Sequence, residues 1–364
     1  MKKHQKHTPL TRPFHGNYGR QEFTLIGAPC DLIHAFSQEL IETFSDFNIG
    51  FVDAAHQSDD QRKAKSTMNY VDNISHNTLE WEGSLDTYQT HMIFSQQDIV
   101  LVNGNHFKGK NQIVFIDPKK KESLQKKLDR LDDVHLFILA EGEDSIWDYL
   151  QDDYAAVPVL KITDKKGIQD FFKNLFTILI PPLSGLVMVG GKSVRMGENK
   201  ARIDYHGVAQ EIHAKQLLAP FTSQVYTSVS IVSSGESTEI KDTFTGLGPF
   251  GGILSAFREH PESAFLVLAC DLPMVDAEAI SYLVGRRDTS KLATAFLNPK
   301  TGFADPLFTI WEPKAYMTML QFLAQGYSCP RKVLINSDIA LLDLPNKNWL
   351  LNVNTPEERA SLGL

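Results

Sequence analysis

The segment VMVGGKSVRMGENKARIDYHG, residues 187–207, decides how the second half of this chain is read. An apolar strand pattern runs directly into Gly190-Gly191, and Arg195 and Lys200 follow at short intervals. Paired glycines allow a sharp turn whose amide groups point at one place, as in backbone sites for phosphate oxygens. The two cations would neutralise a triphosphate as its leaving group departs. The order differs from GxxxxGK[ST] and from GxGxxG, so the segment predicts a phosphate loop of another kind.

Short apolar runs alternate with helical patterns on both sides of this segment, which is typical of α/β architecture with a largely parallel sheet. The predicted strands lie at 23–28, 49–54, 98–104, 112–117, 134–140, 157–162, 184–189, 224–234, 263–270, 291–297 and 307–311. The predicted helices of the first half lie near 31–46, 121–131, 144–152 and 167–177. A single core rarely supports 364 residues, and Pro181-Pro182 cannot continue a helix. We therefore predict a tail (1–20) and two three-layer α/β/α domains (21–178 and 183–364).

The composition is that of a soluble globular enzyme, with 42% hydrophobic and 22% charged residues. A formal charge of −8 argues against nucleic acid as the main partner. The basic start has no apolar core of a signal peptide, and no run reaches the ~18 apolar residues of a membrane helix. We expect a cytoplasmic protein with neither nucleic-acid nor membrane partners. The three cysteines are widely spaced, which predicts no disulfide framework and no zinc site.

Three further motifs follow the glycine-rich segment in order. Asp242 precedes the turn GLGPFGG at 246–252, Asp271 lies in LACDLP at 268–273, and NVNTPEE occupies 352–358. Asp271 ends a buried strand pattern, and ligands of open α/β sheets gather at the carboxyl ends of strands. A carboxylate at that place suits a Mg²⁺ ion that bridges nucleotide phosphates, although Asp after a strand is also a common helix N-cap.

Together the four motifs resemble the molybdenum cofactor nucleotidyltransferases, whose signature is GGxSxRMGxxK, and especially the guanylyltransferase that makes molybdopterin guanine dinucleotide. The resemblance extends from residue 187 to residue 358. It implies a Rossmann-like domain with a mixed, mostly parallel sheet that transfers GMP from GTP to (molybdo)molybdopterin, with Mg²⁺ as cofactor and pyrophosphate as product. Cytidylyl members usually have Ala-Gly where this chain has Gly190-Gly191, which favours GTP.

The resemblance also implies roles for individual residues. The catalytic set is Arg195, Lys200 and Asp271, and the nucleotide-binding set is Val189, Gly190, Gly191, Ser193, Lys200, Asp242, Gly248, Gly252 and Asp271. The metal would be held by Asp271 and Asn354, and the acceptor by Asn352, Asn354 and Asp305. Asp305 lies in an Asp-Pro pair ahead of the strand predicted at 307–311, where a purely structural turn is the alternative. Because the attacking phosphate is already ionised at neutral pH, we expect catalysis by positioning and charge stabilisation, without a Ser-His-Asp relay.

The chain from about residue 20 to 175 resembles, more distantly, the molybdopterin-guanine dinucleotide accessory protein, a small P-loop GTP-binding partner of the guanylyltransferase. FTLIGAPCDLIHAF (23–36) stands at the place of its phosphate loop. A P-loop needs Gly, Lys and Ser or Thr where this chain has Leu32, Ile33 and His34, and Asn103 replaces an acidic residue. We therefore expect a degenerate P-loop domain that does not hydrolyse GTP and that serves dimerisation, docking or scaffolding.

Two other readings stay open from the sequence. One is a nucleotidyltransferase with another base or acceptor, such as CTP with molybdopterin or an NTP with a sugar phosphate. The other is a non-catalytic carrier that keeps the nucleotide pocket. Besides GTP and molybdopterin, the partners to consider are molybdoenzymes, other proteins of cofactor biosynthesis and a second copy of the chain.

Overall fold

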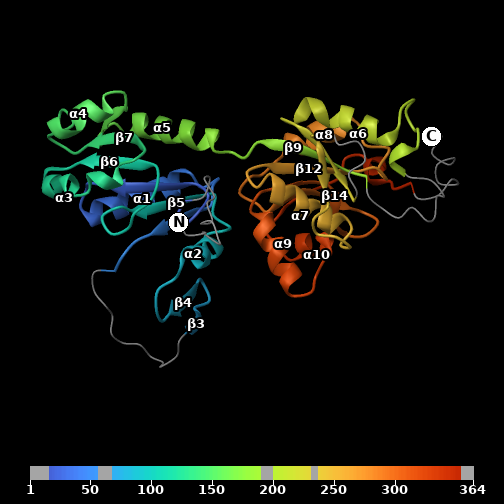
Figure 1. The fold of residues 1–364 in the computed structure, drawn as a ribbon, viewed down its shortest axis with the longest axis horizontal. Coiled ribbons are helices and arrows are strands. Elements are labelled where there is room, and N and C mark those ends of the chain that lie inside the picture. The colour runs from blue at the N-terminus through green and yellow to red at the C-terminus, as the bar shows by residue number, and fades with distance from the viewer. Residues whose placement is uncertain (1–15, 56–67, 190–199, 231–236, 354–364) are drawn as a thin grey trace, which may run out of the picture. The chain divides into compact units, whose positions relative to one another are not determined.

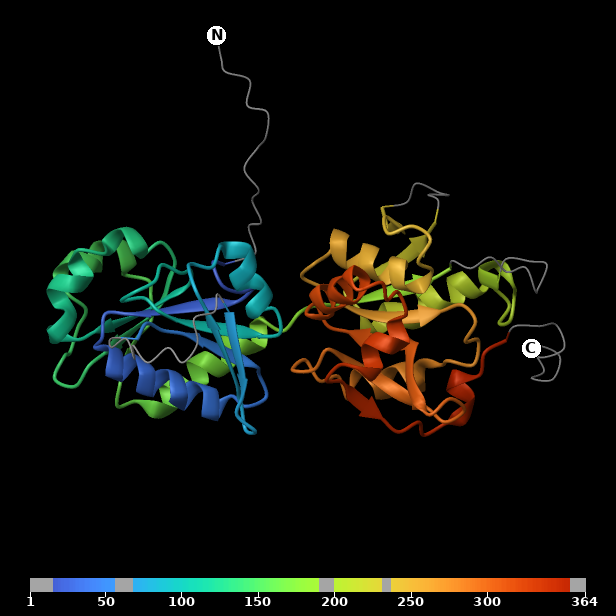
Figure 2. The same cartoon turned by 90° about the horizontal axis from the view of Figure 1, so that it is seen from below.

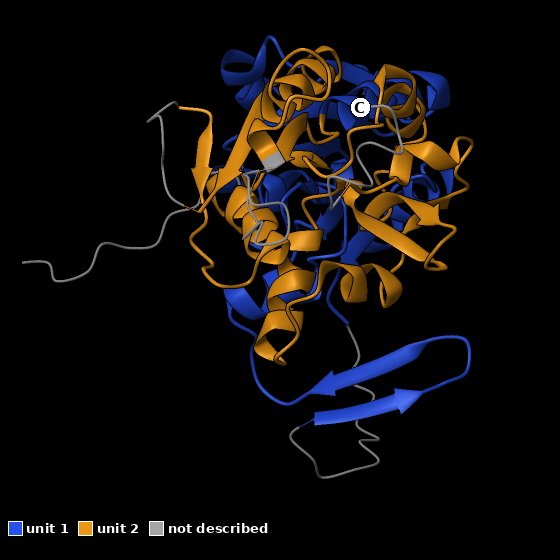
Figure 3. Ribbon diagram, turned by 90° about the vertical axis from the view of Figure 1, so that its right-hand side faces the viewer, with its two compact units in different colours: residues 1–178 blue, residues 179–364 orange. Residues whose placement is uncertain are grey.

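The computed structural model describes residues 16–55, 68–189, 200–230 and 237–353, leaving out the Lys200 side chain. The chain divides into two compact units, residues 1–178 and 179–364 (Figure 3). Each unit is built on one main β-sheet with helices on both faces, and most strand pairs are parallel. The predicted fold class, two α/β units with mostly parallel sheets, is confirmed.

Unit 1 contains a six-stranded sheet in the order β2-β5-β1-β6-β7-β8, in which every pair is parallel (Figure 1). The strands are β1 (Glu22–Ile26), β2 (Ile49–Val52), β5 (Ile99–Asn103), β6 (Gln112–Ile116), β7 (Val134–Leu139) and β8 (Val159–Lys161). The helices are α1 (Cys30–Thr43), α2 (Thr87–Ile93), α3 (Lys121–Gln125), α4 (Asp148–Tyr154) and α5 (Lys165–Ile178). Strands covered on both faces read as continuous apolar runs, which is why they could be located from the sequence.

Two layers of side chains fill unit 1. Phe36 of α1 contacts Phe115 of β6 and Phe172 of α5, so α1 and α5 cover one face of the sheet. Leu124 of α3 and Leu150 of α4 pack into a cluster on the other face. The alternation of side chains along each strand thus supplies both layers.

A two-stranded antiparallel hairpin, β3 (Met68–Asp72) and β4 (Asn77–Trp81), stands apart from the main sheet of unit 1 (Figure 3). Met68 pairs with Trp81 and Tyr70 with Leu79, which places these four side chains on one face. All four are between 46% and 61% exposed. We did not predict this hairpin from the sequence, because its two five-residue strands are mostly exposed and lack the continuous apolar runs that mark the buried strands.

Unit 2 has a seven-stranded sheet in the order β11-β10-β9-β12-β14-β13-β15, and only β14 runs antiparallel to its neighbours. The strands are β9 (Leu183–Met188), β10 (Val225–Val229), β11 (Glu239–Lys241), β12 (Ala264–Ala269), β13 (Ala293–Asn298), β14 (Phe303–Trp311) and β15 (Ala340–Leu342). The helices are α6 (Gln210–Leu218), α7 (Pro249–Glu259), α8 (Ala277–Val284), α9 (Ala315–Ala324) and α10 (Pro330–Ile335). The predicted strand at 224–234 ends at Val229, and residues 231–234 lie outside the described part.

Alternate residues of β12 belong to two different cores of unit 2, one on each face of the sheet. Figures 1 and 2 show the helices that cover these two faces. Phe265 and Val267 pack with α7, α9 and α10, whereas Leu266 and Leu268 pack with α6, α8 and the 3-10 turn η5 (Lys347–Leu350). All four side chains are fully buried or within 1% of it. Side chains of β12 therefore point alternately to the two faces of the sheet, and both faces are covered. This burial is consistent with the place of β12 at the centre of the sheet, between β9 and β14.

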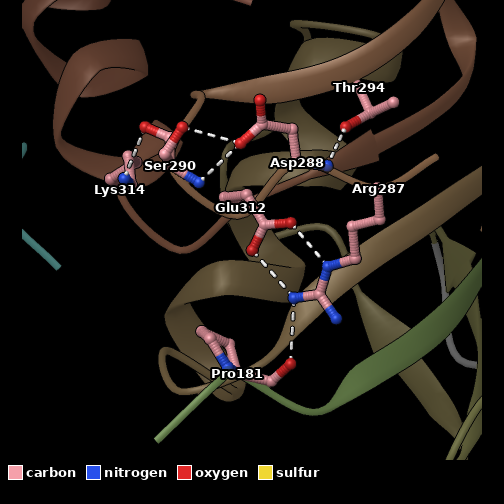
Figure 4. A network of polar contacts seen from close by, with 7 residues as sticks. All are labelled: Pro181, Arg287, Asp288, Ser290, Thr294, Glu312 and Lys314. Carbon is pink, nitrogen blue, oxygen red and sulfur yellow. Dashed lines mark hydrogen bonds and ion pairs between the residues drawn. The ribbon is translucent and has the colours of Figure 1, made fainter. Parts of the chain in front are cut away.

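A buried ion pair between Arg287, which follows α8, and Glu312, which follows β14, also holds the start of unit 2 (Figure 4). Arg287 donates from Nε and Nη2 to the two carboxylate oxygens of Glu312, at 2.7 and 2.8 Å, and Nη2 also donates to the carbonyl of Pro181 at 2.9 Å. Glu312 is 1% exposed, so this two-point contact balances its charge.

In the part of the chain that the structure describes, no helix has the length and apolar character needed to cross a membrane.

Candidate functional site

The candidate site lies at the edge of the unit 2 sheet where β9, β10 and β12 end. The registers pair Met188 of β9 with Ser228 of β10 and with Ala269 of β12, so the three strands finish side by side. Half-buried Val189 follows β9 at this edge. Parallel strands direct their following loops to one place, which is where open α/β sheets bind ligands.

The glycine-rich segment continues from this edge. Gly190, Gly191, Ser193 and Arg195 lie outside the described residues, so their roles stay predictions. Lys200 opens the 3-10 turn η3 (Lys200–Arg202). The backbone of η3 thus follows the glycine-rich segment directly.

Asp242 follows β11 and lies beside the end of β10. Ser228 donates a hydrogen bond from Oγ to Oδ1 of Asp242 at 2.8 Å, and the Asp242 amide donates to the carbonyl of Val229 at 2.8 Å. Burial raises the pKa of the Asp242 carboxyl, and the hydrogen bond from Ser228 opposes part of that rise. The hydrogen bond from Ser228 thus orients the Asp242 carboxylate at the sheet edge. No sequence motif pointed to Ser228.

Two glycines of the GLGPFGG segment have different structural duties. Gly248 caps the N-terminus of α7 with φ 57° and ψ −139°, which side-chain-bearing residues adopt only with strain, and no atom lies within 4 Å of where a Cβ would be. Gly252 has the opposite constraint, because a Cβ there would lie 2.5 Å from Ser228 Oγ and 2.6 Å from Met188 Cε. Gly252 therefore lets α7 approach the ends of β9 and β10, and Gly248 lets the helix begin there.

Asp271 is half-buried just beyond the end of β12. The amide of Val353 donates to the carbonyl oxygen of Asp271 at 3.0 Å, and the preceding Cys270 amide donates to the carbonyl of Met188 at 3.3 Å. Burial raises the pKa of the Cys270 thiol to about 12, so this sulfur is an inert packing group. The Asp271 backbone is thus tied both to β9 and to the C-terminal segment.

The C-terminal segment that reaches Asp271 is anchored by Val353. Val353 is fully buried and packs with Ile203 and Tyr205, which follow η3. The preceding Asn352 is exposed, and Asn354 lies outside the described residues. The structure therefore brings the start of the NVN motif, the chain after Lys200 and Asp271 to one place.

The position of Asp305 in the fold differs from the one predicted from the sequence. It lies inside β14, which begins at Phe303, and not in a turn ahead of a strand at 307–311. The β13–β14 register shifts between Ala295 and Leu297 on one strand and between Ala304 and Thr309 on the other, so Asp305 opens a bulge. The bulge accommodates the proline that follows, which cannot donate to a sheet ladder.

Protein donors already occupy the Asp305 carboxylate. Leu307 donates its amide to Oδ1 at 3.0 Å, Asn298 Nδ2 lies 3.4 Å from Oδ2, and the residue is 7% exposed. Thr309 Oγ1 donates to the Asp305 carbonyl. These contacts assign Asp305 a structural duty within the bulge, and its contact with an acceptor stays a prediction.

Comparison with known proteins gives the domain a family. Residues 185–339 match the model of the MobA-like NTP transferase domain. The second half of this chain therefore contains a MobA-like NTP transferase domain. The prediction of a nucleotidyltransferase in this half is confirmed.

The chain is also similar to individual proteins of known name. The chain is similar, at 32% identity over 183 residues, to the molybdenum cofactor biosynthesis bifunctional protein of Synechocystis; the match covers 49% of this chain and 52% of that protein. It is 26% identical to the molybdenum cofactor guanylyltransferase of Pseudomonas putida, covering 49% of this chain and 96% of the relative. A crystal structure of molybdopterin-guanine dinucleotide biosynthesis protein A from Archaeoglobus fulgidus matches with a TM-score of 0.42 and 21% identity, over 49% of this chain and 95% of that one. The chain thus spans about half the length of the bifunctional relative.

The side chains at the NTP transferase site fit a Mg²⁺ ion that binds together with the nucleotide. No group of three or more His, Cys, Asp or Glu side chains suited to a metal occurs within the described ranges. Mg²⁺ typically takes one or two carboxylates and completes its shell with waters and substrate phosphates. Asp271 supplies one carboxylate at this edge, and Asn354 lies outside the described residues. The residues present fit Mg²⁺ bound mainly through nucleotide phosphates.

A stacked histidine pair flanks the NTP transferase site and was not anticipated from sequence. The rings of His206 and His213 stack with centroids 3.9 Å apart, and His206 Nε2 lies 2.9 Å from the carbonyl of Pro273. Burial, and then the neighbouring His206, lower the pKa of His213. Histidines seven residues apart, one in a turn and one in α6, give no sequence signal of stacking.

In unit 1, the residues at the place of the phosphate loop are used differently. Ile33, which stands where a P-loop has its lysine, is fully buried in α1. The buried Asn103 donates from Nδ2 to Oδ1 of Asp53 at 2.8 Å. Cys30 begins α1 with its Sγ 3.3 Å from His106 Nε2. A lysine side chain at position 33 would bury its charge in the core, so the local packing opposes the phosphate-loop arrangement.

Proposed function

We propose that the NTP transferase domain transfers GMP from GTP to molybdopterin. The observation that carries the proposal is the convergence at one sheet edge of Val189, Asp242, the start of α7, Asp271 and the Asn352–Val353 segment. The matched domain model and the guanylyltransferase relatives support the reaction class. The reaction belongs in the cytoplasm, where GTP is available.

In the proposed reaction an oxygen of the acceptor's phosphate attacks the α-phosphorus of GTP. The bond from that phosphorus to the bridging β-oxygen breaks, and pyrophosphate leaves with the negative charge. The attacking oxygen is already ionised, so no protein base has to remove a proton. The domain's contribution is therefore positioning and charge stabilisation.

We assign different parts of this positioning and charge stabilisation to different residues at the sheet edge. We assign the glycine-rich segment with Arg195 and Lys200 to the triphosphate, where they balance the charge that develops on the leaving group. Gly248 and the amino end of α7 offer amide groups and a partial positive charge on the other side of the same edge. Asp271 would hold Mg²⁺, which when bound supplies a further positive charge on the phosphates.

Asn352 and Asn354 are assigned to the acceptor. An amide both donates and accepts hydrogen bonds, which suits the polar edge of a pterin. The hydrogen bond from the Val353 amide to the Asp271 carbonyl keeps Asn352, the residue before Val353, beside the proposed metal ligand. Transfer needs the acceptor phosphate and the α-phosphorus within contact of one another, and this arrangement supports that proximity.

We further propose that unit 1 does not hydrolyse GTP. It carries Ile33 and His34 where a P-loop has its lysine and its metal-binding hydroxyl, and Ile33 is part of the core. Association with a molybdoenzyme, a cofactor-biosynthesis protein or a second copy is a proposal for the same unit.

Nucleotide selectivity and turnover test the proposed function. Calorimetric binding of GTP, CTP, ATP and UTP with Mg²⁺ to the full chain should show selective GTP binding that is lost in Lys200→Ala. Lys332→Ala, which alters an exposed lysine of α10, is the matched control. Asp271→Ala should keep most GTP binding and lose formation of the guanine dinucleotide from GTP and molybdopterin. Equal binding in wild type and Lys200→Ala, or no transfer by the wild type, would overturn the proposal.

A further inference from the structure

A hollow of about 250 Å³ opens on unit 2 between the β13–β14 turn and η5. Its lining includes Asn298, Lys300, Lys347, Asn348, Leu350 and Leu351. No role has been given above to this hollow or to its two lysines. A volume below the ~300 Å³ of typical small-molecule pockets suits one part of a ligand and not a whole nucleotide.

The walls of the hollow are held in place by the protein itself. Asn298 is 7% exposed and accepts a hydrogen bond from the Lys300 amide on Oδ1 at 3.0 Å. On the other wall the amide of Asn348 donates to Oδ1 of Asn346 at 3.0 Å, and Leu350 is 4% exposed. Both lysines therefore extend from backbones that are fixed before any ligand binds, which lowers the entropy cost of binding.

The hollow lies close to the proposed transfer site along the chain. Leu351 lines it, and two residues further on Val353 bonds to the Asp271 carbonyl. Two residues of extended chain span at most ~7 Å, so the hollow begins within one sugar-sized group of Asp271. On its other side, Asn298 contacts the Asp305 carboxylate at the bulge.

The chemistry of the lining selects a class of ligand. Within the described ranges, neither the Lys300 nor the Lys347 ammonium group takes part in an ion pair, although the whole chain carries a charge of −8. Two cations, the polar groups of Asn348 and the apolar side chains of Leu350 and Leu351 suit a flat, hydrogen-bonding heterocycle that bears anionic substituents. A simple sugar phosphate has no such heterocycle at the end remote from its phosphate.

We propose that this hollow binds the end of the acceptor that lies away from the reacting phosphate, with Lys300 and Lys347 holding its anionic groups. The inference rests on the proposed guanylyl transfer and adds to it the residues that select the acceptor. GTP would occupy the edge formed by β9, β10 and α7, and the acceptor would extend from Asp271 past Leu351 into the hollow.

Steady-state kinetics on the full chain separates this inference from the proposed function. In Lys300→Ala/Lys347→Ala, the KM for molybdopterin should rise at least about tenfold, while kcat and the KM for GTP stay within about twofold. Lys300→Arg/Lys347→Arg should recover most of the loss, and Lys332→Ala on the opposite face of the sheet should behave as wild type. An unchanged acceptor KM in the double variant overturns the role of the hollow and leaves guanylyl transfer standing.

Direct binding of molybdopterin without GTP gives a readout that needs no turnover. Anaerobic titration should show binding to the wild type that weakens at least about tenfold in Lys300→Ala/Lys347→Ala. Equal affinity for the two proteins, or no binding to the wild type, overturns the inference. Wild-type protein that binds molybdopterin through these lysines but transfers no nucleotide would refute the proposed function alone.

Discussion

The amide of Val353 donates a hydrogen bond to the carbonyl oxygen of Asp271, with 3.0 Å between nitrogen and oxygen. This contact joins residues 82 positions apart in the sequence, one just past a central strand and the other near the C-terminus. Because the bond is made by backbone atoms, substitution of the Asp271 side chain leaves its donor and acceptor in place. It therefore positions the asparagine motif independently of any bound metal.

Val353→Pro removes the amide that makes this bond, whereas Val353→Ala keeps the amide and removes only packing against Ile203 and Tyr205. We expect both variants to be destabilised, and the proline variant to lose at least about tenfold more transfer activity because the acceptor asparagines lose their position. Stopped-time assays of guanine dinucleotide formation, with thermal unfolding recorded in parallel, provide the comparison. Equal residual activities would show that the hydrogen bond has no part in positioning.

Gly252→Ala tests the close approach of α7 to the strand ends. A Cβ would lie 2.5 Å from Ser228 Oγ and 2.6 Å from Met188 Cε, so either these side chains or the helix must shift. Overpacking of this kind costs about 1–3 kcal/mol of unfolding free energy, and GTP binding should weaken as the edge is displaced. Ser228→Ala removes the nearer atom, so the double variant should be more stable than the sum of the two single changes predicts. Urea unfolding of the four proteins gives the coupling energy, and strict additivity would contradict the steric account.

Gly248→Ala should destabilise for a different reason. The space around a Cβ is open, and the cost comes from φ 57° and ψ −139°, a strained backbone conformation worth about 1–3 kcal/mol. Since no side chain is displaced, the effect should add to that of Ser228→Ala within the error of the measurement. A coupling as large as that expected for Gly252→Ala would show that the helix start is limited by packing as well.

The central strands could be predicted because burial on both faces leaves a continuous apolar run. AFLVLA of β12 is buried along its whole length, and the strands of unit 1 that pair on both sides read the same way. The exposed hairpin β3–β4 and the three-residue edge strand β11 carry no such run, and β15 is an edge strand of only three residues that are not buried. Pattern reasoning thus finds the core and misses elements that are set by local pairing.

Some residues of the candidate site could likewise be predicted from the sequence, and others could not. Asp242, Gly248 and Asp271 could be located from motifs, because their residue types are dictated by loops at strand ends. Ser228 could not, since a serine inside a strand has no distinguishing neighbour in sequence. Asp305 was predicted in a turn because Asp-Pro favours turns, whereas the bulge in β14 accommodates the pair within a strand.

Asp242→Asn should reveal the cost of burying a carboxylate at the edge. The pKa of Asp242 is raised in the folded chain, mainly by burial, so the folded state binds a proton more tightly than the unfolded state. Its contribution to stability is therefore present at acid pH and is lost as pH rises through the raised pKa. Asparagine does not titrate and can still accept from Ser228, so the variant should gain unfolding free energy relative to wild type as pH rises from about 4 to 7. A stability difference that is flat over this range would contradict the assignment of the burial effect to Asp242.

Arg287→Met tests the ion pair that holds the start of unit 2. Glu312 is 1% exposed and receives two hydrogen bonds from Arg287, so loss of the guanidinium removes both bonds and the positive charge from a buried carboxylate, and removes the Arg287 donor from the Pro181 carbonyl (Figure 4). Breaking a buried pair in this way costs about 3–5 kcal/mol, whereas replacing both members by apolar residues is often far milder. Urea unfolding followed by fluorescence should place Arg287→Met well below Arg287→Met/Glu312→Leu. If the double variant were the less stable of the two, the buried carboxylate would not be the source of the loss, and Glu312 would be stabilising unit 2 through contacts other than Arg287.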